Sequence, residues 1–98
     1  QGRGVPKDAR QAARWLNLSS EKGHVESQAL LGQLMLTGAA GVPRQTALGL
    51  MWLTLARDGA DPERHAEIID AHRAAFESAS VEDREAALLF LQRQVNRR

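Results

Sequence analysis

The side chains that could carry out acid–base or metal chemistry lie in the second half of this 98-residue chain. His65 and His72 stand seven positions apart, which on a helix separates them by about 10.5 Å along the axis. Zinc ligands lie only about 2.0–2.1 Å from the metal, so this pair cannot chelate one ion. Glu63 and Glu67 lie one helical turn apart, but Arg64 between them favours a solvated charged face. The sequence therefore predicts no catalytic residue, no metal site and no cofactor in this region.

Other sequence signals also argue against an enzyme. The glycine-rich loops at 2–4 and 38–41 lack the strand–loop–helix setting and the Lys-Ser/Thr ending of a phosphate loop. The chain contains no cysteine, which excludes disulfides, Cys–zinc sites and thiol catalysis. Its net charge of +1 does not indicate nucleic-acid binding, which requires a basic bias. No apolar run approaches the length of about 18 residues that a membrane span needs.

The chain is predicted to be all helical, because its apolar residues recur at spacings of three and four throughout. Gly23 is expected to stop the first helix, since glycine adopts a positive φ without steric cost. Asp61 followed by proline indicates the start of the fourth helix, and Ser80 with an acid three residues later resembles a capping box. The expected helices cover about 9–22, 25–37, 46–57, 61–78 and 80–94.

The second expected helix is apolar on most sides, which predicts burial between neighbours. One face is the exception, and it is formed by Glu26, Leu30, Gln33 and Thr37. We expect packing within the domain to leave this face free. We therefore predict that Glu26, Leu30 and Gln33 contact a partner protein.

Two stretches of the chain are nearly copies of each other. GVPKDARQAARWL at 4–16 and GVPRQTALGLMWL at 41–53 place the two tryptophans, Trp15 and Trp52, 37 positions apart. A helix pair with its loops takes about 34–47 residues in helical repeat proteins. Both indoles are predicted to pack at equivalent seams between repeats. The residues that define the repeat are Gly4, Val5, Trp15, Gly23, Leu31, Gly32, Gly41, Val42 and Trp52.

This order of residues resembles the Sel-like repeat, a relative of the tetratricopeptide repeat, over residues 2–59. The resemblance implies an all-α fold, a right-handed α-α superhelix (solenoid) of antiparallel helix pairs with about five helices. It also implies a non-enzymatic scaffold, adaptor or regulator that binds a protein partner. Bacterial relatives are often exported, so the resemblance implies the periplasm, with the cytoplasm left open.

The resemblance divides the chain, taken as a C-terminal fragment of a longer repeat protein, into three parts of one domain. Residues 1–23 hold the second helix of a truncated repeat, 24–60 a complete repeat, and 61–98 a C-terminal capping helix pair. The bare face of the first helix is expected to favour self-association. The alternative function is a small-molecule binder or a hydrolase-like, β-lactam-related protein, which the lack of cysteine and of a catalytic motif disfavours.

Overall fold

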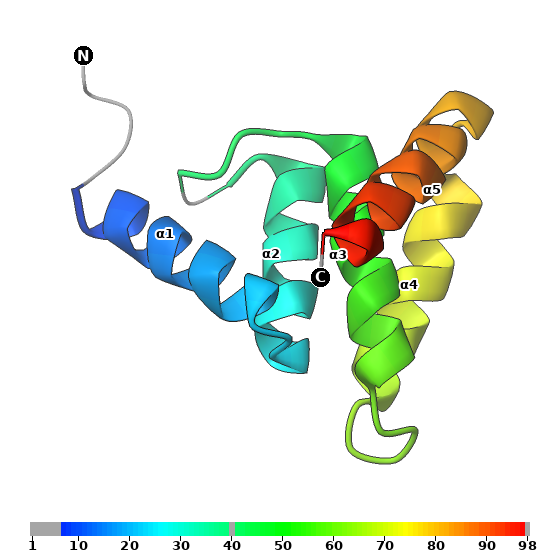
Figure 1. The fold of residues 1–98 in the computed structure, drawn as a ribbon, viewed down its shortest axis with the longest axis horizontal. Coiled ribbons are helices and arrows are strands. Elements are labelled where there is room, and N and C mark those ends of the chain that lie inside the picture. The colour runs from blue at the N-terminus through cyan, green and yellow to red at the C-terminus, as the bar shows by residue number, and fades with distance from the viewer. Residues whose placement is uncertain (1–6, 40, 98) are drawn as a thin grey trace.

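The computed structural model describes residues 7–39 and 41–97, with side chains from residue 10 onward. Five α-helices make up this part of the chain, and no strand occurs within it (Figure 1). The all-α prediction is therefore confirmed for the described residues. The helices are α1 (Lys7–Glu21), α2 (Val25–Thr37), α3 (Thr46–Gly59), α4 (Ala66–Ser78) and α5 (Val81–Asn96).

The start of α4 differs from the predicted one. The helix begins at Ala66, five residues after Asp61. The Asp61 carboxylate does cap backbone donors, because its Oδ1 accepts the N–H of Glu63 at 2.8 Å and of Arg64 at 3.2 Å. His65 interrupts the helical path with φ −118°, and its ring binds back to the Asp61 N–H. Residues 62–65 therefore form turns that precede the helix.

The other helix ends lie close to their expected places. The first helix begins at Lys7 and ends just before Gly23, whose φ of 96° places it in the left-handed region. Gly38 closes α2 in the same region, and its N–H donates to the Leu34 carbonyl. The Ser80 hydroxyl accepts the Asp83 N–H at 3.0 Å, which confirms the predicted cap of α5.

Helix α3 is the central element of the fold. It packs closely against α2, α4 and α5, whereas α1 packs mainly on α2, on the side away from α3 (Figure 1). Helices α4 and α5 pack on α3 more closely than on each other. Their direct link includes the Arg84 Nε, which donates to the Phe76 carbonyl at 2.8 Å. The division of the chain at 1–23, 24–60 and 61–98 stays a prediction.

The closest contact between helices joins α2 to α3. A Cβ built on Gly32 would lie 2.8 Å from the Gly49 carbonyl oxygen, and a Cβ on Gly49 would lie 2.8 Å from that of Gly32. Two backbones can approach this closely only where neither residue has a side chain. The core of the molecule consists of two clusters of buried residues: Leu31, Val42, Met51 and Trp52, and Ala29, Leu53 and Ala56.

The prediction that both tryptophans lie in equivalent packed seams is wrong for Trp15. Trp52 is buried, with 4% of its surface exposed, whereas Trp15 is 73% exposed. The physical reason is that α3 is covered by helices on several sides, while α1 packs mainly on α2 within residues 7–39 and 41–97. Two further repeat positions, Gly4 and Val5, lie outside the described residues.

Candidate protein-interaction surface

The exposed face of α2 is the one that the sequence predicted. Glu26, Leu30, Gln33 and Thr37 are the four exposed positions of this helix, and the positions between them are buried or half-buried. Leu30 is unusual among them, because half of a large apolar side chain is exposed to water. A single exposed leucine is ordinary on a protein surface, so it is the groove beside Leu30 that makes this face a candidate contact surface.

Three of these residues line a groove together with the approach to α4. This groove, which we call the charged groove, has a volume of about 400 Å³. Its first wall is α2, and its second wall is the turn at 62–65 with the first residues of α4. The lining residues are Glu26, Ala29, Leu30, Gln33, Arg64, His65, Glu67 and Ile68. The structure therefore brings the predicted α2 residues together with four residues that the sequence did not assign to the site.

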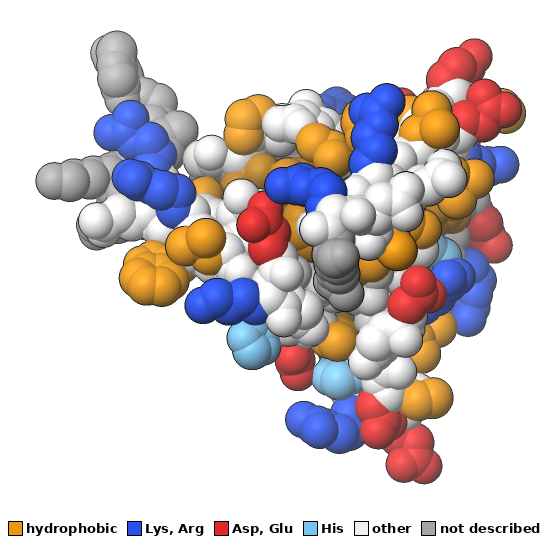
Figure 2. Space-filling view, in the orientation of Figure 1, with side chains coloured by type: hydrophobic (Ala, Val, Ile, Leu, Met, Phe, Trp, Pro, Cys, Tyr) orange, Lys and Arg blue, Asp and Glu red, His pale blue; other side chains and the backbone are white. Residues whose placement is uncertain are grey.

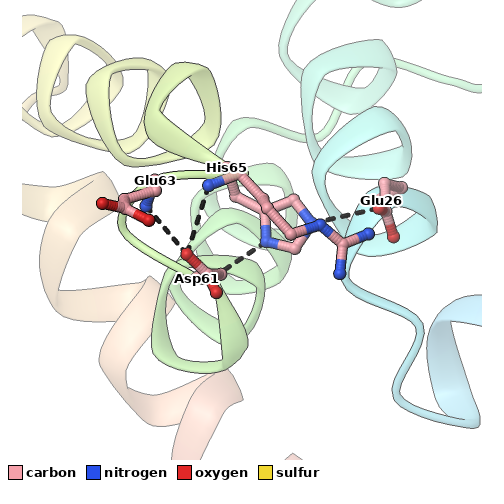
Figure 3. Close-up of polar contacts among 5 residues, drawn as sticks. Glu26, Asp61, Glu63 and His65 are labelled. Atoms are coloured by element: carbon pink, nitrogen blue, oxygen red, sulfur yellow. Dashed lines mark hydrogen bonds and ion pairs between the residues drawn. The ribbon is translucent and has the colours of Figure 1, made fainter.

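A chain of hydrogen bonds joins the turn before α4 to α2 (Figure 3). The Asp61 N–H donates to His65 Nδ1 at 2.9 Å, and His65 Nε2 lies 3.0 Å from Glu26 Oε2. Since Nδ1 accepts a hydrogen bond, the neutral imidazole carries its hydrogen on Nε2 and donates a hydrogen bond to Glu26. The hydrogen bond from His65 is the main reason why the pKa of Glu26 lies below its ordinary value. His65 thus joins one groove wall to the other.

A second groove, which we call the apolar groove, lies between α1 and α2 and has a volume of about 690 Å³. Small side chains form much of its surface, and Trp15, Leu16 and Leu34 supply its large apolar contacts. Leu30 lines this groove as well as the charged groove. The two grooves therefore adjoin each other along α2, with Leu30 on the ridge between them.

His72 and His24 line neither the charged groove nor the apolar groove. His72 lies on α4 between α3 and α5, with its ring centroid 4.6 Å from that of Phe76. His24 is exposed after the end of α1. In the described ranges, no group of three or more His, Asp or Glu side chains could hold a metal ion.

A family model of the Sel1 repeat matches the chain twice, at residues 1–24 and 25–61. These two matches cover more than half of the chain. The chain belongs to the Sel1 repeat family. Sel1 repeats are helical solenoids, so the predicted all-α superhelix is confirmed. Searches of curated proteins and of solved structures found no match.

Sel1 repeats are typically protein-interaction modules and are generally non-catalytic. This family assignment supports a protein as the class of partner. Within residues 7–39 and 41–97, no helix has both the length and the hydropathy needed to cross a membrane.

The part of the surface that sequence reasoning missed is the α4 wall. Arg64 and His65 look like helix residues in the sequence, and nothing in their spacing indicates that they face α2. One signal was present: Asp61-Pro62 marks a tight turn after α3, and such a turn brings the following residues back toward the preceding helices. The residue on α2 that pairs with this turn, Glu26, could not be deduced from it.

Proposed function

We propose that this chain is a non-enzymatic protein-interaction scaffold that binds a segment of a partner protein in the charged groove. The observation that carries the proposal is the placement of Glu26, Leu30 and Gln33. They lie on the one exposed face of α2 and line a groove whose opposite wall is already formed by the turn at 62–65 and the start of α4.

The groove offers a partner both apolar and charged contacts. Leu30 and Ile68, from opposite walls, can receive an apolar side chain, and burying one such side chain contributes about 1.5–3 kcal/mol. Glu67 and Arg64 supply charges of opposite sign beside it. This arrangement favours a peptide segment with one apolar anchor flanked by a basic and an acidic residue, because rim charges determine register and specificity.

The His65 network supports binding without rearrangement. Its bonds to Asp61 and Glu26 hold the turn at 62–65 against α2 before any partner arrives. A groove that is already formed loses less conformational entropy when a partner binds. The same bonds leave one Glu26 oxygen for a partner, since His65 contacts only Oε2.

The alternative function, a small-molecule binder or a hydrolase-like protein, requires polar groups that converge in a deep pocket. The larger groove is lined mainly by alanine, leucine and tryptophan, and its polar side chains Ser19 and Ser27 are hydrogen-bonded to each other at 2.8 Å. The described residues thus favour a contact surface over an active site.

Affinity capture from a lysate of the source cells, with mass spectrometry of bound proteins, tests the proposal. The triple variant Glu26→Ala, Leu30→Ala, Gln33→Ala is expected to lose the partner that the wild-type chain retains, while its helical circular dichroism stays unchanged. Undiminished capture by the triple variant would reject the charged groove as the binding site.

A matched control separates the groove from general surface hydrophobicity. Leu18→Ala removes a leucine that is 51% exposed on α1, close to the 50% of Leu30 on α2. Leu30→Ala alone is expected to weaken capture, and Leu18→Ala to leave it unchanged. Equal weakening by both would indicate non-specific adhesion.

A further inference from the structure

Two exposed apolar surfaces lie on the first and the last helix of the chain. On α1, Trp15 is 73% and Leu18 51% exposed. On α5, four apolar residues are more than half exposed, namely Val81, Leu88, Leu89 and Val95. In Figure 2, hydrophobic side chains reach the surface both near α1, at the left, and around α5, at the upper right. Clusters of this kind indicate surfaces that bind other proteins.

The surface on α1, which we call the α1 face, is built by one helix. Gln11, Arg14, Trp15 and Leu18 surround a depression of about 250 Å³. These positions follow the spacing of three and four that places side chains on one side of a helix. The face therefore combines a large indole, a leucine and a guanidinium group, with Arg10 exposed one turn earlier.

The surface on α5, which we call the α5 stripe, runs along most of the helix. Val81, Leu88 and Val95 are seven positions apart, so they lie on one side of the helix. Other positions of the helix pack on α3, namely Ala87, Phe90 and Leu91. Leu88 also lines a groove with Thr54 on α3 and Phe76 on α4, yet more than half of its surface stays exposed, as in the rest of the stripe.

Charge distinguishes the two ends of the α5 stripe. Glu82 and Glu85 are exposed beside its beginning, and Arg93 and Arg97 are exposed near its end. On α1, Arg10 and Arg14 precede the apolar pair of Trp15 and Leu18. If α1 of one copy and α5 of another run parallel, Arg10 and Arg14 lie beside Glu82 and Glu85. If the helices run antiparallel, Arg10 and Arg14 lie beside the arginines of α5.

We propose that the chain assembles head to tail, with the α1 face of one copy packed parallel on the α5 stripe of a second copy. In this arrangement Trp15 and Leu18 cover Leu88 and Leu89, and Arg14 pairs with Glu85. Pairing of two α1 faces around Trp15 is less favourable, because it brings the Arg14 side chains of both copies together. The contact is heterologous, so a pair of copies keeps one free α1 face and one free α5 stripe, and further copies can be added.

Sedimentation equilibrium over a range of concentrations tests this assembly. The apparent mass of the wild-type chain is expected to rise above the 10.8 kDa of one copy as concentration increases, and to rise less in high salt, which screens the charges. Trp15→Ser and Leu88→Ser are each expected to stay monomeric. Both side chains are exposed, so both variants should keep the wild-type circular dichroism.

Mixing the two variants distinguishes head-to-tail contact from pairing of two α1 faces or of two α5 stripes. Trp15→Ser retains an intact α5 stripe and Leu88→Ser an intact α1 face, so an equimolar mixture should form a dimer and nothing larger. A charge exchange tests the orientation: Arg14→Glu should prevent assembly, and adding Glu85→Arg in the same chain should restore it. A monomeric wild-type chain, assembly of Trp15→Ser alone, or a monomeric mixture would each overturn the proposal.

Discussion

Trp15 and Trp52 occupy the same position in two copies of one sequence pattern, yet one is 73% and the other 4% exposed. Both stand in the second half of GVP-containing stretches and both are followed by Leu-x-Leu. Their helices differ in what surrounds them: α3 has three close neighbours, and α1 packs mainly on α2. The repeat therefore specifies where an indole points, and the neighbouring helices decide whether it is buried.

The largest effect expected from this difference is on stability. Trp52→Ala removes a large side chain from the core cluster that also holds Leu31 and Met51, and should lower the free energy of unfolding by about 3–5 kcal/mol. Trp15→Ala removes an exposed side chain and should change it by no more than about 0.5 kcal/mol. Urea unfolding followed by circular dichroism measures both. Similar losses for the two variants would contradict the structure.

The two copies of the pattern also differ in how closely their helices approach a neighbouring backbone. Gly49, where α3 meets α2, has Ala12 as its counterpart 37 positions earlier on α1. Ala12 is exposed and tolerates its Cβ, while a Cβ at Gly49 would lie 2.8 Å from the Gly32 carbonyl oxygen. The close approach of the backbones belongs to the α2–α3 pair, and within the described residues α1 has no equivalent of it.

Gly49→Ala is expected to destabilise the chain by about 1–3 kcal/mol, because the two backbones must separate to admit a methyl group. Gly59→Ala is the matched control on the same helix. Its new Cβ would meet only a methyl group of Val25, at 3.0 Å, and its stability should remain within about 1 kcal/mol of wild type. If thermal unfolding shows no difference between the two variants, the Gly32–Gly49 contact is not tight.

The sequence predicted the parts of the fold that depend on local pattern. The exposed positions of α2, the stop at Gly23 and the Ser80 cap follow from helical periodicity and from the chemistry of single residues. These features need no knowledge of distant contacts. They account for one wall of the charged groove, because Glu26, Leu30 and Gln33 are set by the period of one helix.

The parts that could not be predicted depend on contacts between distant segments. His65 faces Glu26, 39 positions away, because the turn at 62–65 is held by the Asp61–His65 hydrogen bond. The exposure of Trp15 depends on the absence of a second neighbour on α1 among the described helices. Periodicity contains neither kind of information, so the second groove wall and the exposed indole required the structure.

A smaller effect distinguishes two adjacent serines at the end of α1, where it packs on α2. The Ser20 hydroxyl is fully buried and has no hydrogen-bond partner among the described residues, while Ser19 bonds Ser27 on α2 at 2.8 Å. Ser20→Ala should therefore stabilise the chain by about 1 kcal/mol, and Ser19→Ala should destabilise it by about 0.5–1 kcal/mol. Chemical denaturation of both variants checks the opposite signs, and a loss of stability in Ser20→Ala would contradict the unpaired hydroxyl.

The smallest expected effect is a pH dependence of stability that arises from His72 on α4. Burial lowers the pKa of His72 below its ordinary value of 6.5, with a further contribution from the positive charge of Arg57, opposed in part by Asp58. The unfolded chain therefore binds a proton at a higher pH than the folded one, so stability is lost as pH falls through 6.5 toward the lower folded value. In His72→Leu this part of the pH dependence should disappear. Urea midpoints for the wild type and the variant across this pH range measure it, and parallel curves would show that the packing of His72 against Phe76 does not exclude the charged form.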